Sequence, residues 1–193
     1  MATKVDICNR ALNSLGVKQR ITSLNEDTEV ARKCNLVIDD LIDEVLRAYN
    51  WNCATERAAL ARSSSAPVFD YAYKYALPAG PDPAYCLRVI KIKDEDEFSD
   101  WKVEGRFLLT DESTCSILYI KRVTDINELD VLCKSAIAAR LAAEIAFTLT
   151  NSNSLQESMW NLYAGKLQEA SEIDAQEGTA GKYESESWID ERG

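Results

Sequence analysis

All four prolines of this 193-residue chain fall between positions 67 and 83. Proline fixes its own φ and lacks the N–H that a helix or a central strand needs, so this stretch cannot lie inside a long regular element. Apolar residues recur at helical spacing before it and far beyond it, whereas short alternating runs lie around and directly after it. The prolines therefore predict a boundary between helical and β-structured parts of the chain.

Helices are predicted by apolar spacing together with start and stop signals. The first covers about 4–15, with Gly16 placed as a C-terminal stop. The second begins after an acidic turn, carries one long apolar stripe and covers about 27–61. The last covers about 154–177 and starts with a Ser-x-x-Glu capping box at Ser154.

A further helix, over about 127–149, is rich in alanine. Small side chains let helix axes approach closely, so we expect this helix to be packed on more than one side. Arg140 and Glu144 are one turn apart on it. A modest i, i+4 ion pair accounts for these two residues unless both are buried.

The middle of the chain, about 69–123, is predicted to form a small antiparallel sheet of about four strands. Phe69, Tyr71, Tyr73 and Tyr75 alternate with small or charged residues, which predicts a strand with an aromatic face. We expect the protein's own helices or a neighbouring subunit to cover that face. The predicted fold class is α+β, mainly α: a helical bundle with a small antiparallel β-sheet inserted between the N-terminal and C-terminal helices.

Residues 1–178 are interpreted as one domain and residues 179–193 as an extended C-terminal tail. From position 169 onward eight acidic residues accompany two basic ones, a net charge of 2 − 8 = −6. A segment too polar to fold gains nothing from showing large aromatic side chains to water, whereas segments that order on binding use them as anchors. Tyr183, Trp188 and Ile189 are therefore predicted to bind a partner.

Charge and composition exclude several classes of function. The chain has 22 Lys and Arg against 32 Asp and Glu, a net charge of 22 − 32 = −10. Such a field repels phosphate backbones unless basic residues gather on one face, so nucleic acid is a poor candidate for a tight ligand. The longest apolar runs are far too short to span a membrane, and no signal peptide is recognisable. We expect a soluble protein that stays where it is made.

No catalytic, cofactor-binding or metal-ligating residue is predicted. The chain has no His, which removes the commonest general base and metal ligand. Its six cysteines form no C-x-x-C pair and suit small buried hydrophobes in a reducing compartment, and its glycines form no nucleotide-binding motif. Asp39, Asp43 and Glu44 lie close together along one helix, where a solvated face is a better interpretation than an acid–base pair.

Several strings of the sequence resemble, in their order and spacing, phage head-to-tail connector proteins, the tail tubular protein A-like adaptors. The resemblance extends from about residue 5 to residue 178. The strings lie at residues 11–16 (ALNSLG), 21–32 (ITSLNEDTEVAR), 51–61 (WNCATERAALA), 73–78 (YKYALP), 86–89 (CLRV), 103–106 (VEGR), 141–142 (LA) and 174–178 (DAQEG).

The resemblance implies a structural virion protein and not an enzyme. Such adaptors form a ring, usually of twelve copies, which docks under the portal protein of the capsid and presents its far side to the tail tube or nozzle. A helical bundle forms the ring wall, a β region extends from it, and the C-terminal segment grips the portal. DNA leaves through the channel without specific binding, no cofactor is needed, and assembly takes place in the cytoplasm of the host bacterium.

Alternative functions remain open at this point. A tail-completion or stopper subunit would sit at another level of the same neck and differ only in the ring it touches. A muralytic enzyme using two carboxylates is a more distant alternative, because a pair of acids across a cleft has no sequence signature here. A nucleic-acid-binding module is disfavoured by the acidic balance.

Overall fold

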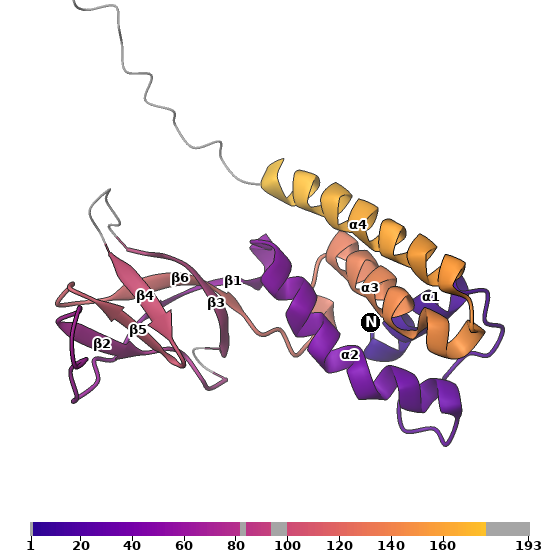
Figure 1. The fold of residues 1–193 in the computed structure, drawn as a ribbon, viewed down its shortest axis with the longest axis horizontal. Coiled ribbons are helices and arrows are strands. Elements are labelled where there is room, and N and C mark those ends of the chain that lie inside the picture. Colours follow the sequence, from indigo (N-terminus) through magenta and orange to yellow (C-terminus); the bar gives the residue numbers. More distant parts are fainter. Residues whose placement is uncertain (1, 82–83, 94–99, 177–193) are drawn as a thin grey trace, which may run out of the picture.

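The computed structural model describes residues 2–81, 84–93 and 100–176, and within them the fold is α+β. Four helices form a bundle, and six strands form a separate β module beside it (Figure 1). The α-helices are α1 Lys4–Ser14, α2 Glu29–Ala48, α3 Val131–Thr150 and α4 Asn153–Gln176. The strands are β1 Thr55–Ala59, β2 Tyr73–Ala76, β3 Cys86–Ile92, β4 Trp101–Glu104, β5 Phe107–Thr110 and β6 Ser116–Lys121, and two 3₁₀ turns are η1 Asn52–Ala54 and η2 Ile126–Glu128.

The alanine-rich helix α3 is the centre of the bundle, because it packs against α1, α2 and α4. Its alanines are buried along most of its length, which agrees with the prediction that small side chains let this helix pack on more than one side. Asp130 caps its first turn by accepting a hydrogen bond from the Leu132 N–H at 2.7 Å, so the helix starts at Val131 and not near 127. Asn151, in the left-handed region at φ 53°, ends it.

Helix α1 ends as predicted, in a Schellman motif at Gly16. The Val17 N–H donates to the Leu12 carbonyl at 3.0 Å and the Gly16 N–H donates to the Asn13 carbonyl at 3.1 Å. Gly16 has φ +70°, which only glycine adopts without strain. Helix α4 starts at Asn153, one residue before Ser154, because Ser152 and not Ser154 accepts from the N–H at the third helical position, 3.2 Å away.

The prediction of one helix over 27–61 is wrong beyond residue 48. Helix α2 stops at Ala48, Tyr49 takes an extended conformation, and the chain passes through η1 into strand β1. Trp51 explains the stop: its buried ring folds back, and its indole N–H donates to the Val45 carbonyl at 2.9 Å. This bond satisfies a carbonyl in the last turn of the helix, which has no partner within the helix itself.

The β module differs from the single four-stranded sheet predicted over 69–123. It consists of two three-stranded antiparallel sheets, in the orders β1-β6-β3 and β2-β5-β4, and it begins at β1. An isolated antiparallel bridge pairs Arg62, which follows β1, with Tyr75 of β2. Side chains from both sheets share one core, which includes Tyr75, Leu108, Ile117 and Tyr119.

The aromatic strand predicted over 69–75 is only partly formed. Phe69 is 75% exposed, and Asp70 has a left-handed φ of 69°, which interrupts the extended conformation. Strand β2 starts at Tyr73, and Tyr75 is buried with its hydroxyl donating to the Glu112 carbonyl at 2.8 Å. The aromatic face therefore covers part of the module core, and its first members lie in a loop.

The six cysteines are free thiols; five are buried, and Cys53 is partly buried. This confirms their interpretation as small apolar residues. The predicted anchors Tyr183, Trp188 and Ile189 lie outside the described residues.

Candidate functional site

The β module is an insertion between α2 and α3, and the place where it meets the bundle is the candidate functional site, here called the neck. The chain enters the module through β1 and leaves it through β6, and these strands pair side by side with Thr55 opposite Ile120. Ile120 and Leu87 belong to the core of the bundle and not to that of the module. The two parts therefore share buried surface at the neck.

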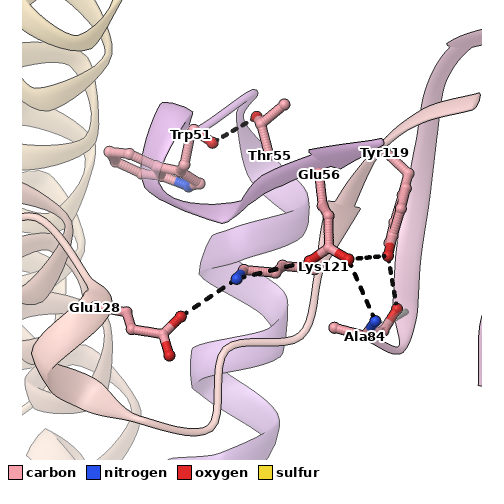
Figure 2. Close-up of polar contacts among 7 residues, drawn as sticks. All are labelled: Trp51, Thr55, Glu56, Ala84, Tyr119, Lys121 and Glu128. Atoms are coloured by element: carbon pink, nitrogen blue, oxygen red, sulfur yellow. Dashed lines mark hydrogen bonds and ion pairs between the residues drawn. The ribbon is translucent and has the colours of Figure 1, made fainter. Parts of the chain in front are cut away.

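Trp51 is the first part of the neck. Its carbonyl accepts a hydrogen bond from the Thr55 hydroxyl at 2.7 Å, so the residue that ends α2 also fixes the first residue of β1 (Figure 2). Tyr49 packs edge-on against the Trp51 ring, with the ring centroids 5.5 Å apart. The direction in which the chain leaves the bundle is thus set by a buried aromatic residue.

Glu56 is the second part of the neck. The Glu56 carboxylate accepts from the Tyr119 hydroxyl at 3.1 Å and from the Ala84 N–H at 3.5 Å (Figure 2). The Tyr119 oxygen also lies 2.9 Å from the Ala84 carbonyl, and its one proton serves one of these two acceptors at a time. Lys121 lies 3.6 Å from Glu56 and 3.3 Å from Glu128, so one cation connects β1 to η2.

The end of helix α4 is the third part of the neck. Both carboxylate oxygens of Asp174 accept from the Asn52 N–H, at 3.1 and 3.2 Å, and the Asn52 side-chain amide donates to the Asp174 carbonyl at 2.8 Å. Asp174 is buried although it is charged. Residues 122 positions apart are thereby joined, and the C-terminal end of α4 is held beside the start of the β module (Figure 1).

Arg140 forms a second polar cluster, inside the bundle. Its side chain donates to Glu44 at 3.1 Å and to Glu144 at 2.7 Å, and its guanidinium lies 4.4 Å from the centre of the Trp160 ring. Burial alone would lower the pKa of Arg140, but the hydrogen bonds to Glu144 and Glu44 outweigh it and raise that pKa. The i, i+4 pair with Glu144 is present as expected, and of its two members only Arg140 is buried, at 7% exposed. Glu44 is a further partner that sequence reasoning missed.

The carboxylates of α2 are solvated as expected at Asp39 and Glu44, which are exposed, and Asp43 is partly buried, but each of the three also makes an ion pair. Asp39 pairs with Lys4 of α1 at 2.6 Å, Asp43 pairs with Arg122 after β6, and Glu44 pairs with Arg140. Each carboxylate thus holds a cation from a different part of the fold. Their spacing on α2 carried no signal for this, because the cations come from other elements.

Two pairs of cysteines lie within hydrogen-bonding reach of each other. The hydrogen bond from the Cys133 thiol lowers the pKa of Cys53 to about 7, and the same bond raises the pKa of Cys133. The hydrogen bond between Cys8 and Cys34 raises the pKa of Cys8 and lowers that of Cys34. Among the described residues no group of three or more Cys, Asp or Glu side chains is arranged to hold a metal ion.

Comparison with models of known protein families finds no match, and neither does comparison with curated proteins. In the described part of the chain, no helix has the length and apolar character needed to cross a membrane.

Proposed function

We propose that this chain is a structural virion protein that forms the head-to-tail adaptor ring. The ring docks on the portal, links the capsid to the tail tube or nozzle, and leaves a channel for DNA. The alternative within the same neck is a tail-completion or stopper subunit, which would bind a neighbouring ring instead of the portal.

The observation that carries the proposal is where the strings that resemble adaptors lie in the fold. Trp51 and Asn52 belong to one string and Asp174 to another, and they meet at the neck through the hydrogen bonds described above. A third string supplies Leu87, which is buried in the bundle core, and Arg88, which donates to the Asn50 side chain at 2.6 Å. Three strings that are far apart in the sequence thus meet at the neck, which supports treating them as parts of one family pattern.

The shape of the molecule also supports the proposal. Adaptors of this kind build a ring wall from helices and extend a β region from it, and here a bundle with a core of its own carries a β module at one end (Figure 1). The neck fixes that module through buried residues and hydrogen bonds. A rigid subunit of this kind suits a part that transmits position from one ring to the next.

The acidic charge has a function under this proposal. With twelve copies, the ring carries a formal charge of 12 × −10 = −120. DNA that passes an acidic wall is repelled and does not adhere, because each missing Lys or Arg contact is one phosphate fewer to hold it.

The C-terminal residues are assigned to portal binding. Tyr183, Trp188 and Ile189 follow α4, whose end is held at the neck by Asp174. In a pull-down with purified portal rings, deletion of residues 179–193 is expected to abolish binding. Trp188→Ala with Ile189→Ala should weaken it strongly, whereas the control Ser185→Ala with Ser187→Ala should bind as the wild type does.

Electron microscopy of the chain with and without portal rings tests the proposal as a whole. A ring of density added under the portal is the expected result. Binding to a preassembled portal–adaptor complex of the same phage, and not to the portal alone, would assign the chain to the stopper level. Failure to bind either ring would overturn the proposal.

A further inference from the structure

One side of the helical bundle carries a basic groove in an otherwise acidic protein. The groove lies between α1, α3 and α4 and has a volume of about 570 Å³. Arg10, Arg20 and Lys166 line it together with one acidic residue, Asp6, so the lining has a net charge of 3 − 1 = +2. Ala138 and Ala139 of α3 lie on its wall. Leu162 of α4 lies at its edge and is 37% exposed.

One cation of this basic groove, Lys166, is paired with Glu169 at 2.6 Å, so the two arginines carry the unpaired charge of the groove. Arg10 donates to the Ser135 hydroxyl at 2.8 Å, and neither Arg10 nor Arg20 makes an ion pair with a described residue. By contrast, Arg122 and Arg140 are each held by carboxylates. In a chain of net charge −10, two exposed arginines without an ion pair to a described residue form a surface that suits an acidic partner.

The other side of the α3–α4 pair carries an acidic–aromatic flank, formed by Phe147, Trp160, Glu44 and Glu144. Phe147 and Trp160 are 42% and 40% exposed, although both are large apolar side chains. The carboxylates of Glu44 and Glu144 are about half exposed and share the single cation of Arg140, so this flank has a net charge of −1. Exposed aromatic residues ringed by polar groups are typical of protein–protein interfaces.

Helical periodicity places these two surfaces on opposite sides. On α3, Arg140, Glu144 and Phe147 share one stripe at i, i+4 and i+7, whereas Ser135 and Ala138 lie about half a turn away. On α4, Trp160 and Leu162 are two residues apart, which turns their side chains by about 200° relative to each other. Figure 1 shows α4 running along α3, with α2 on the far side of α3 from α4.

We propose that the acidic–aromatic flank of one copy of this chain docks into the basic groove of the next copy. Glu44 and Glu144 of one copy face Arg10 and Arg20 of its neighbour, and Phe147 and Trp160 bury their exposed surface against the wall of the groove. Because the two surfaces differ and lie on opposite sides, the contact is head-to-tail, and its repetition gives a ring when the rotation between copies closes, as the proposed ring function requires. This inference rests on the proposed ring function and names the contact that builds the ring.

The test uses two variants that each block one surface. Arg10→Glu with Arg20→Glu blocks the groove, and Phe147→Lys blocks the flank while leaving Arg140 and its partners in place. Each variant alone is expected to need at least about tenfold more protein than the wild type to reach half assembly, measured as particle mass in solution. An equimolar mixture of the two is expected to stop at dimers, because each pair then has one intact contact and two blocked ends.

A matched control separates this contact from a general effect of charge. Arg57→Glu with Lys91→Glu makes the same change in net charge on the β module and is expected to assemble as the wild type does. Circular dichroism and urea midpoints check that every variant is folded. If the groove variant or the flank variant forms normal rings, and the wild-type ring binds the portal, this inference is overturned and the proposed function stands. A wild-type chain that forms no ring, alone or on the portal, would overturn both.

Discussion

Arg140 concentrates the electrostatics of the bundle in one residue. It is buried, it pairs with carboxylates from α2 and α3, and its guanidinium lies over the Trp160 ring of α4. Its removal leaves Glu44 and Glu144 without the cation that they share. Breaking a buried ion pair in this way is strongly destabilising, and the partial exposure of both glutamates moderates the cost.

Arg140→Met is therefore expected to lower the free energy of unfolding by about 2 kcal/mol, measured by urea denaturation. The matched control is Lys102→Met, which removes an exposed cation 2.9 Å from Glu104 and should change stability by less than about 0.5 kcal/mol. Equal effects for the two variants would show that the cluster inside the bundle is no stronger than a surface pair.

Cys53 is expected to be the most reactive thiol of the described residues. It is partly buried, whereas the other five cysteines are buried, and the Cys133 thiol lowers the pKa of Cys53 to about 7. The thiolate is the reactive form, so alkylation by iodoacetamide should be half-maximal near pH 7. Cys53→Ser should abolish the fast phase, whereas Cys86→Ser should retain it.

The same pKa shift links stability to pH. The ordinary pKa of a cysteine thiol is 9.0 and the folded value for Cys53 is about 7, so between these values the unfolded chain binds the proton that the folded chain has lost. The stability of the wild type relative to Cys53→Ser is expected to rise as the pH increases from 7 to 9, and this gain disappears as the pH falls below 7. Urea midpoints measured across this range provide the check, and a flat difference would contradict the shift.

At the scale of elements, the contribution of a glycine to stability depends on whether it ends a helix or lies inside one. Gly16→Ala forces a Cβ into a left-handed conformation, although no atom lies within 4 Å of that Cβ, and should lower stability by about 1 kcal/mol. Gly165→Ala lies inside α4 with equal space and no positive φ, and should raise stability by about 0.8 kcal/mol. Thermal unfolding of the two variants provides the check: the melting temperature should fall for Gly16→Ala and rise for Gly165→Ala.

The hydrogen bond between η1 and α4 is testable at the same scale. Asn52→Ala removes the donor to the Asp174 carbonyl but keeps the backbone N–H that binds the Asp174 carboxylate. Stability should fall by about 1 kcal/mol, and amide hydrogen exchange should accelerate in the last turns of α4. Unchanged exchange there would show that Asn52 does not hold the end of the helix. Asn161→Ala, an exposed position on the same helix, is the control.

The elements that sequence reasoning predicted well are those whose signals are local. The end of α1 at Gly16 and the alanine-rich helix α3 follow from residues within a few positions of each other. Strand β1 was missed because its sequence, TERAA, favours a helix, and it becomes a strand only through pairing with β6. The tertiary pairing overrides local preference there.

The neck was beyond sequence reasoning for the same cause. Glu56 and Tyr119 are 63 positions apart, and Asn52 and Asp174 are 122 positions apart, so no periodicity relates them. The binding of a partner by Tyr183, Trp188 and Ile189 was inferred from composition alone, and it stays a prediction.

At the scale of the whole molecule, the bundle and the β module are coupled through Ile120 and Leu87. Ile120 lies on a strand of the module but is fully buried in the bundle core. Ile120→Ala is expected to cost about 3 kcal/mol and to lower the denaturation midpoints of both parts together, followed by hydrogen exchange of peptides from each. Ile117→Ala removes a side chain buried only in the module core, so its effect should be larger in the module than in the bundle.

The antiparallel pairing of β1 with β6 means that the chain enters and leaves the β module at the same place, because both of its ends lie side by side. Excision of the insert leaves two chain ends near enough for a short turn to rejoin. A foreign insert with equally close ends can be grafted at the same place. Recombination between related genes can therefore exchange this module, provided that the incoming one supplies apolar side chains where Ile120 and Leu87 complete the bundle core.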